Sequence, residues 1–184
     1  MSSAAVSSSF SASSESARHI EITIGRHDGG LVSTYLCDHA RPGMVVGLDS
    51  VGGDFVLPAI RPRRILFVSG GSGITPVMSM LRTLRADGFE GEIAFVHYAR
   101  SPEEACYADE LAAMTGVRVL HGYTRGGDGD LTGYFHADHL ATAMPDPADD
   151  AAVFVCGPPA LVEAVRTHCP ASKDRKSTRL NSSH

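Results

Sequence analysis

Residues 69–76 read SGGSGITP and lie between an apolar β-branched run and a helical pattern. Glycines let the backbone turn tightly and bring its N–H groups close to an anion, and a helix start adds the positive end of its dipole. We expect Thr75 at the N-cap and Pro76 in the first helical turn. The stretch predicts a diphosphate site, with an ordinary glycine-rich turn as the alternative. The residues assigned to this site are Gly70, Gly71, Ser72, Gly73, Ile74, Thr75 and Pro76.

Two better-known motifs differ from this stretch. Pro76 stands where the dinucleotide fingerprint G-x-G-x-x-G has its third glycine, and the lysine of a P-loop is absent. The stretch is also close to the G-x-S-x-G nucleophile elbow of serine hydrolases, but Ile74 occupies the last glycine position. A serine hydrolase with Ser72 as its nucleophile is therefore a remote alternative.

A second candidate feature ends the last apolar run of the chain, where Cys156, Gly157 and Pro158 follow Val155. In doubly wound sheets, ligands bind at the carboxyl ends of the strands. We therefore expect these three residues at a ligand site. Outside that context, a cysteine of this kind is more often a buried core thiol.

Composition excludes several classes of protein. The 184 residues carry a net charge of −5 with no basic cluster on the globular stretch, which argues against nucleic-acid binding. No apolar run approaches the ~20 residues of a membrane span, and no secretion leader is visible. The four cysteines form no C-x-x-C pair, so we expect no zinc or iron–sulfur site, reduced thiols and a cytoplasmic protein.

The C-terminal residues differ abruptly in composition from the rest. Residues 1–171 contain no Lys, Asn or Gln, whereas both lysines and the single asparagine lie in residues 172–184. We predict that 172–184 is a non-native tail and leave it out of the fold. A natural polar tail is the alternative.

The elements expected before residue 60 are short. Residues 1–16 contain nine serines and form a Ser-rich lead, and the alternation of Ile with polar residues over 18–26 predicts a half-buried strand. A short helix is expected over 32–40, and two short strands over 44–48 and 55–57. Residues 17–60 therefore predict the C-terminal part of an antiparallel β domain, which ends in a proline-containing linker.

After the linker, apolar runs alternate with helical patterns. Strands are expected over 64–69, 92–98, 117–121 and 151–156, and helices over 76–86, 102–114, 136–143 and 159–168. This alternation predicts an α/β domain over 61–171, built on a doubly wound parallel sheet.

Together, G-G-S-G-I-T-P at 70–76 and C-G-P-P at 156–159 resemble the ferredoxin–NADP⁺ reductase superfamily. HYARS at 97–101, GGLVS at 29–33 and GDF at 53–55 resemble further family segments, so the resemblance covers residues 9–168. It is closest to bacterial reductases with a C-terminal [2Fe-2S] domain that serve oxygenases or acyl-CoA desaturases. It implies a flavin-dependent oxidoreductase that passes a hydride from NAD(P)H to FAD, and electrons on to an iron–sulfur centre or partner protein.

The resemblance also implies roles for single residues. Ser9 would hydrogen-bond the flavin ring, Thr75 would lie at the dinucleotide diphosphate, and Cys156 would lie beside the nicotinamide C4; these three are the catalytic candidates. The segments that would hold FAD contribute Ser9, Phe10, Ser11, Gly30, Val32 and Ser33.

The flavin signature R-x-Y-S of the family is only partly present. Val6 stands at the Arg position and Ser8 at the Tyr position, so the diphosphate charge partner and the stacking ring are missing. We expect a chain shortened at both ends, with a [2Fe-2S] cluster only in a missing C-terminal domain. The alternative is a non-catalytic NADP-binding fragment that cannot retain FAD.

Charge at two strand ends bears on the choice of nucleotide. NAD sites usually offer a carboxylate to the ribose 2′-OH, and NADP sites an arginine to the 2′-phosphate. Arg100, Ser101 and Arg125 follow the second and third strands, which favours NADP over NAD. His136 and His139 could touch one metal, but no third ligand is in view, so no metal site is expected.

Overall fold

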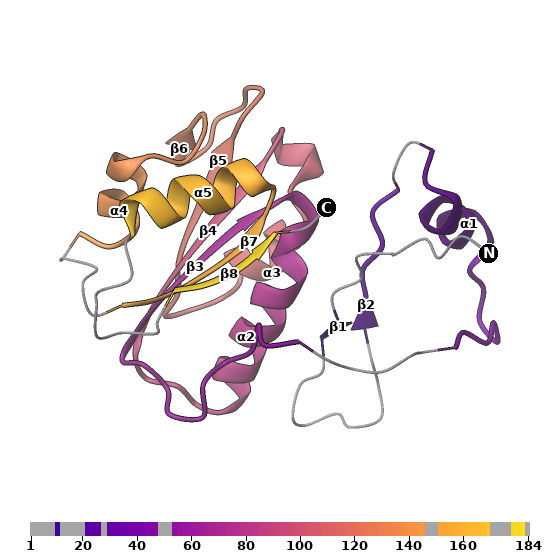
Figure 1. Cartoon of the computed structure of the whole chain (residues 1–184), viewed down its shortest axis with the longest axis horizontal. Helices are drawn as coiled ribbons and strands as arrows, with labels where there is room; N and C mark the ends of the chain where they lie inside the picture. The colour runs from indigo at the N-terminus through magenta and orange to yellow at the C-terminus, as the bar shows by residue number, and fades with distance from the viewer. Residues whose placement is uncertain are drawn as a thin grey trace.

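A six-stranded sheet, parallel throughout, forms the centre of the computed structural model, with strand order β6-β5-β4-β3-β7-β8 (Figure 1). The structure describes residues 10–11, 21–26, 29–47, 53–145, 151–169 and 178–182. The predicted doubly wound parallel α/β fold is confirmed. The strands are β3 Arg64–Gly70, β4 Glu92–Ala99, β5 Arg118–Tyr123, β6 Leu131–Thr132, β7 Ala152–Gly157 and β8 Thr178–Ser182.

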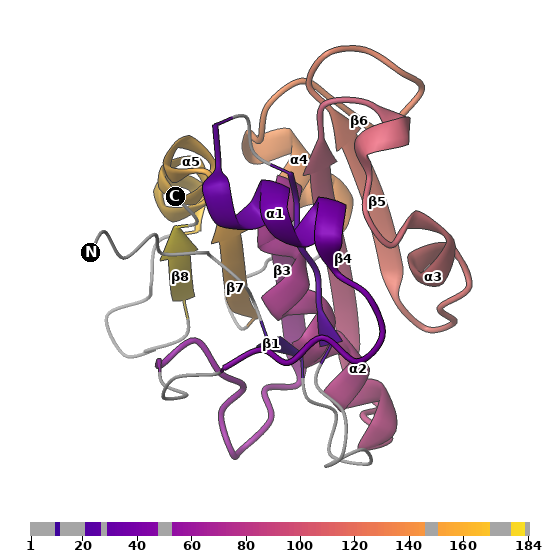
Figure 2. The same ribbon diagram turned by 90° about the vertical axis from the view of Figure 1, so that its right-hand side faces the viewer.

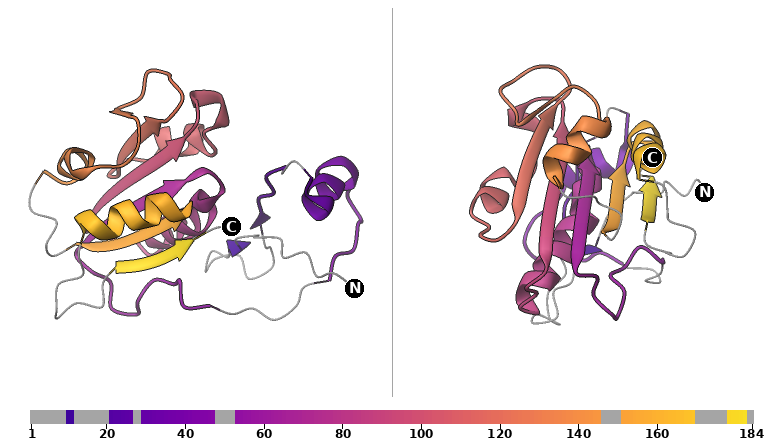
Figure 3. Two further views of the ribbon diagram at one scale, coloured as in Figure 1. Left: turned by 45° about the horizontal axis from the view of Figure 1, so that its top comes forward. Right: turned by 90° about the vertical axis from the view of Figure 1, so that its left-hand side faces the viewer.

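Helices cover both faces of this sheet (Figure 3). Helices α2 (Ile74–Ala86) and α3 (Ala108–Ala112) pack on one face, and α4 (Ala137–Ala143) and α5 (Pro159–His168) on the other. Successive side chains of a strand point to opposite faces, so Phe67 joins the α2 core while Val68 joins the α5 core. Burial on both sides explains why the strands are continuous apolar runs rather than alternating ones.

The order of the strands fixes where a ligand can bind. From β3 the chain passes to β4 on one side, and later returns to β7 on the other. Connections that leave a strand in opposite directions open a crevice at the carboxyl ends of the two strands. Ser69 of β3 lies in register with Cys156 of β7, so both predicted motifs follow directly at that crevice.

The segment before residue 61 is built from few regular elements (Figures 1 and 2). Strand β1 (Phe10–Ser11) pairs antiparallel with β2 (Glu21–Ile22), and α1 (Leu31–His39) matches the expected helix over 32–40. The strand expected over 18–26 is wrong for 23–26, and 18–20 lie outside the described residues.

The two short strands expected over 44–48 and 55–57 are wrong for residues 44–47 and 55–57, while Leu48 lies outside the described residues. A strand requires a neighbouring strand for its backbone hydrogen bonds. Val45 is 93% exposed, and Phe55 instead packs its ring edge-on against Phe154, 6.2 Å between centroids. Residues 55–57 therefore cover the α2 core rather than extend a sheet.

The helix expected over 102–114 is interrupted. It consists of a 3₁₀ turn, Pro102–Glu104, and the short α3. Tyr107, between them, has φ +59°, a left-handed conformation that cannot continue a right-handed helix. The two-residue strand β6 was not predicted, because so short a run carries no periodic signal.

The C-terminal residues contribute a strand to the sheet. The exclusion of 172–184 from the fold is wrong for Thr178–Ser182, which forms β8, parallel to β7 along its outer edge. An edge strand presents unpaired backbone groups to any extended segment that reaches it, which is the physical basis of this pairing. None of the helices in the described ranges is long and apolar enough to span a membrane.

Candidate nucleotide-binding site

The ends of β3 and β7 meet backbone against backbone. A Cβ added to Gly73 would lie 2.3 Å from the Cys156 carbonyl oxygen, and one on Gly157 would lie 3.0 Å from the Gly70 nitrogen. Only glycine permits the approach at Gly73, because real Cβ atoms essentially never lie within 3.0 Å of a backbone atom, and a Cβ at Gly157 would be tightly crowded. The two motifs, far apart in the chain, therefore form one site at the carboxyl edge of the sheet.

The turn after β3 leads directly into α2. Gly71 has φ +54° and opens a 3₁₀ turn, Gly71–Gly73, after which α2 begins at Ile74. The expectation of Thr75 at the N-cap is wrong: the N-cap is Gly73, and the Thr75 hydroxyl donates to the Ser72 carbonyl at 3.1 Å. Pro76 lies in the first helical turn, as predicted. No side chain of the described residues caps α2, so these residues leave the positive end of its dipole open to an anion.

Cys156, whose backbone packs against the turn at Gly73, carries a neutral thiol. Its side chain is 2% exposed, and burial raises the pKa of the thiol to about 11. A thiol that remains protonated near neutral pH is a small apolar surface rather than a nucleophile. Cys156 can therefore shape the site by contact, and its carbonyl packs against Gly73.

A row of polar residues that was not predicted crosses the buried strands beside Cys156. Ser69, His97 and His121 are in register on β3, β4 and β5. The Ser69 hydroxyl lies 2.9 Å from His97 Nδ1, and burial, together with His121, lowers the pKa of His97 to about 4. Within the described residues, Nε2 of each histidine has no hydrogen-bond partner. The sequence does contain a signal for this row, because each of the three polar residues lies near the end of an apolar run.

The serine hydrolase alternative finds no support in this geometry. Ser72 is exposed in the 3₁₀ turn and, among the described residues, makes no hydrogen bond to a histidine. The serine that does bond a histidine is Ser69, which is completely buried. A buried hydroxyl cannot reach a substrate carbonyl.

The two candidate arginines stand on neighbouring strand ends. The Arg125 backbone N–H donates to the Arg100 carbonyl at 2.9 Å. The Arg100 guanidinium pairs with Glu104 at 3.7 Å, whereas no carboxylate in the described residues pairs with Arg125. The Ser101 hydroxyl hydrogen-bonds the Glu103 carboxylate and lowers its pKa. Of these side chains, Arg125 is thus the one most available to an anionic ligand.

The candidate flavin residues are described in part. Ser9 lies outside the described residues, and Phe10 and Ser11 form β1. Gly30 is the N-cap of α1, with no side-chain cap, and Val32 and Ser33 lie in its first turn. No residue of α1 is buried, and Figure 1 shows this helix standing apart from the sheet.

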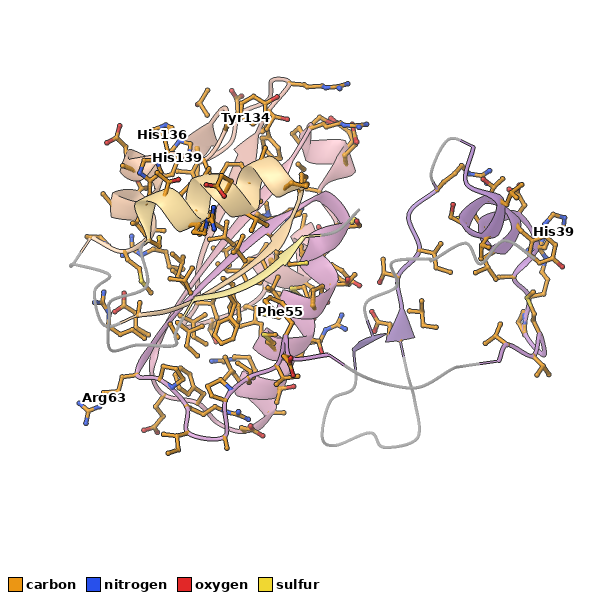
Figure 4. The ribbon with its side chains drawn as sticks, viewed as in Figure 1. His39, Phe55, Arg63, Tyr134, His136 and His139 are labelled. Atoms are coloured by element: carbon orange, nitrogen blue, oxygen red, sulfur yellow. The ribbon has the colours of Figure 1, made fainter. Side chains whose placement is uncertain are left out.

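The two histidines considered as metal ligands lie at α4, on the face of the sheet opposite to α2. Figure 4 shows His136 and His139 together at α4, with ring centroids 3.8 Å apart. His139 Nδ1 is hydrogen-bonded to the Tyr98 hydroxyl at 2.7 Å. In the described part of the chain, no three or more His, Cys, Asp or Glu residues are grouped so that they could hold a metal ion.

The fold and the site define a nucleotide-binding α/β domain, with a glycine turn at the switch point of a parallel sheet. Residues 67–167 match the family described as the oxidoreductase NAD-binding domain, and the chain belongs to this family. The resemblance to ferredoxin–NADP⁺ reductases is confirmed.

Individual relatives agree with this assignment. The chain is 37% identical over 152 residues to an NADPH oxidoreductase of Mycobacterium tuberculosis, covering 80% of this chain and 38% of the relative. It is 33% identical to the ferredoxin reductase component of 3-ketosteroid-9-alpha-monooxygenase from the same species, covering 84% and 42%. The chain thus spans about two fifths of the length of these curated relatives.

A solved structure extends the likeness in three dimensions. Phthalate dioxygenase reductase, described as a modular structure for electron transfer from pyridine nucleotides to [2Fe-2S], superposes with a TM-score of 0.73 at 26% identity. The superposition covers 95% of this chain and 52% of that one.

Proposed function

We propose that this chain forms the NAD(P)-binding part, and the end of the flavin-binding part, of a flavin-dependent NAD(P)H oxidoreductase. The observation that carries the proposal is the approach of Gly73 to the Cys156 carbonyl, which joins the glycine turn to the end of β7. The domains we propose are a Ser-rich lead over 1–16, a flavin-side segment over 17–60, the NAD(P)-binding domain over 61–171 and a tail of non-native origin over 172–184, whose residues Thr178–Ser182 pair with β7 of that domain.

The glycine turn fits a dinucleotide diphosphate. Among the described residues, nothing lies within 4 Å of the position that a Cβ on Gly71 would take, which leaves room for an anion at the backbone, and the start of α2 offers favourable electrostatics. Cys156, neutral and buried, would contact the nicotinamide ring and orient it. Thr75 would keep the turn in shape through its bond to the Ser72 carbonyl.

The nucleotide we favour is NADP. Arg125 is exposed and without a carboxylate partner in the described part of the chain, so its guanidinium suits a 2′-phosphate. Arg100 would contribute less, because its guanidinium already has a carboxylate partner in Glu104. Ser101 would help hold the ribose side of the nucleotide.

FAD is the second cofactor we propose, held by Ser9 and the turn of Gly30, Val32 and Ser33 at the start of α1. With both cofactors bound, the dihydronicotinamide would supply a hydride from C4 and the flavin would accept it, so that the nicotinamide would be oxidised and the flavin reduced. The residues of this chain would bind, orient and exclude water from the two rings.

The electron acceptor would be an iron–sulfur protein, an oxygenase or a desaturase, with any [2Fe-2S] cluster on a further domain. Support comes from relatives that are reductase components of a 3-ketosteroid-9-alpha-monooxygenase and a glycine betaine monooxygenase. We place such a reductase in the cytoplasm.

A second candidate is a non-catalytic NADP-binding module. It is favoured by Val6 and Ser8, which stand where the flavin signature has its Arg and Tyr. Both residues lie outside the described residues, so this alternative rests on sequence.

Calorimetric titration of the 184-residue chain with NADPH, NADH and FAD separates these functions. The proposal predicts binding of NADPH at micromolar concentration, weaker binding of NADH and retention of FAD with flavin absorbance. Binding of NADPH without FAD would support the non-catalytic module. A chain that binds neither nucleotide nor FAD would contradict both.

A further inference from the structure

Arg82, in the middle of α2, links three elements through its guanidinium. Its Nε and Nη2 each donate to a Glu110 carboxylate oxygen on α3, both at 2.7 Å. Its Nη1 donates to Glu21 on β2 at 3.1 Å. A planar guanidinium is suited to this double recognition, because its fixed fork grips one carboxylate bidentately and still offers a donor to the other.

Tyr107 completes the same cluster from the turn before α3. The Arg82 guanidinium lies 5.2 Å from the centre of the Tyr107 ring, a cation–π distance. The Tyr107 hydroxyl donates to Glu21 at 3.3 Å and is hydrogen-bonded to the Thr23 hydroxyl. Tyr107 is the N-cap of α3 and has a left-handed backbone, φ +59°. We call Glu21, Thr23, Arg82, Tyr107 and Glu110 the Arg82 cluster.

The cluster connects the flavin-side segment with the helix that begins at the glycine turn. Glu21 and Thr23 belong to or follow β2, and β1, the antiparallel partner of β2, lies against α2 (Figure 1). Arg82 lies eight residues after Ile74, about 12 Å along α2 at 1.5 Å per residue. One rigid helix therefore carries the diphosphate-facing turn at its start and the attachment of residues 21–23 further along.

We propose that Arg82 is a positioning residue that clamps the flavin-side segment to α2. In the proposed function, on which this inference rests, the flavin lies on the segment before residue 61, and the nicotinamide lies beside Cys156 with the dinucleotide diphosphate on the turn at Gly71–Gly73. Hydride transfer requires the reacting atoms to lie about 3–3.5 Å apart, and a misplacement of about 1 Å costs roughly a hundredfold in rate. A clamp between the two cofactor-binding segments acts on that distance.

Hydrogen exchange on the 184-residue chain tests the clamp without any cofactor. Glu21→Gln removes the charge that reaches across to α2, at a carboxylate that is 53% exposed, so the α/β domain keeps its fold. We expect amide exchange in residues 21–26 to rise at least fivefold, with β3 and β7 unchanged. Arg166→Gln, in the exposed pair Arg166–Glu163 on α5, is the matched control and leaves residues 21–26 unchanged. Unchanged exchange in Glu21→Gln and Arg82→Gln would overturn the clamp.

Stopped-flow reduction of bound FAD by NADPH tests the positioning role. Arg82→Gln is expected to slow hydride transfer about tenfold or more, while the NADPH dissociation constant stays within twofold. Arg82→Lys should restore part of the rate, because an ammonium reaches one carboxylate but cannot hold two. A loosened segment with an unchanged hydride-transfer rate would overturn the positioning role. Failure of the wild-type chain to bind FAD or NADPH would contradict the proposed function, and the exchange result would still decide the clamp.

Discussion

The hydroxyl of Ser69 and Nδ1 of His97 lie 2.9 Å apart in a completely buried position between β3 and β4. The hydroxyl also lies 3.4 Å from the Val96 carbonyl, so it joins the imidazole to the strand backbone. Ser69 lies in register with Cys156 on β7 and two residues before the 3₁₀ turn that begins at Gly71. The pair makes the buried end of the site sensitive to the protonation of a single imidazole.

Stability should fall in mild acid because of His97. Burial lowers the pKa of His97 from 6.5 to about 4 in the folded chain, so the unfolded chain binds the proton first. The contribution is complete above about pH 6.5 and is lost as the pH falls towards 4, by up to about 3 kcal/mol at 1.36 kcal/mol per pKa unit. Chemical denaturation across this range measures it.

His97→Gln should remove most of that pH dependence while keeping a partner for Ser69. His121 and His139, whose pKa values burial also lowers, leave a smaller slope. An equal slope in His97→Gln and the wild type would contradict this interpretation.

Arg125 should set the choice between NADPH and NADH. Charge-assisted hydrogen bonds contribute about 1.5–3 kcal/mol, so Arg125→Ala should weaken NADPH binding roughly 10- to 100-fold and leave NADH binding nearly unchanged. Arg100→Ala is the matched control, with a smaller effect because Glu104 already pairs with that guanidinium. Equal losses for both nucleotides in Arg125→Ala would show that the residue does not contact a 2′-phosphate.

Gly73→Ala should damage the turn and the nucleotide site together. The added Cβ would lie 2.3 Å from the Cys156 carbonyl oxygen, so β7 or the turn must move. We expect a loss of about 1–3 kcal/mol in the free energy of unfolding and at least a tenfold loss of NADPH affinity. Gly47→Ala, where nothing lies within 4 Å, should change neither quantity. Wild-type affinity in Gly73→Ala would mean that the turn does not hold the diphosphate.

Cys156 should react slowly with thiol reagents. Burial raises its pKa to about 11, so little thiolate exists at pH 8, whereas Cys37 and Cys106 are exposed. Iodoacetamide labelling followed by peptide mass spectrometry should modify the two exposed cysteines first, and Cys156 at least tenfold more slowly. Cys156 among the earliest labelled residues would be inconsistent with a buried neutral thiol at the site.

The parts of the site that could be predicted are local in the sequence. The glycine turn and the Cys156-Gly157-Pro158 segment each follow an apolar run. The exposed backbone N–H groups expected of the first predict an anion site, and the position of the second predicts the carboxyl end of a strand. The approach of Gly73 to Cys156 depends on β3 and β7 being neighbours, which a single sequence does not encode in any local pattern. The same holds for Ser69 and His97, whose contact follows from strand register.

The wrong predictions also have local causes. Residues 44–47 are as apolar as a strand, but no strand in the described part of the chain pairs with them. An apolar pattern does not form a strand without a partner for its backbone hydrogen bonds. Tyr107 interrupts the helix expected over 102–114 with a left-handed backbone conformation, which a tyrosine does not predict. In the folded chain the same residue contacts Arg82 and Glu21.

Binding of a dinucleotide where β3 and β7 end is tested most directly by backbone amide NMR during titration with NADP⁺. We predict saturable chemical-shift changes concentrated at residues 70–76, 100–101, 125 and 156–158. The amides of α4 and of the C-terminal turn of α5 should be unaffected. Saturable binding with its shifts elsewhere, or no shifts at millimolar NADP⁺, would contradict a dinucleotide site at these strand ends.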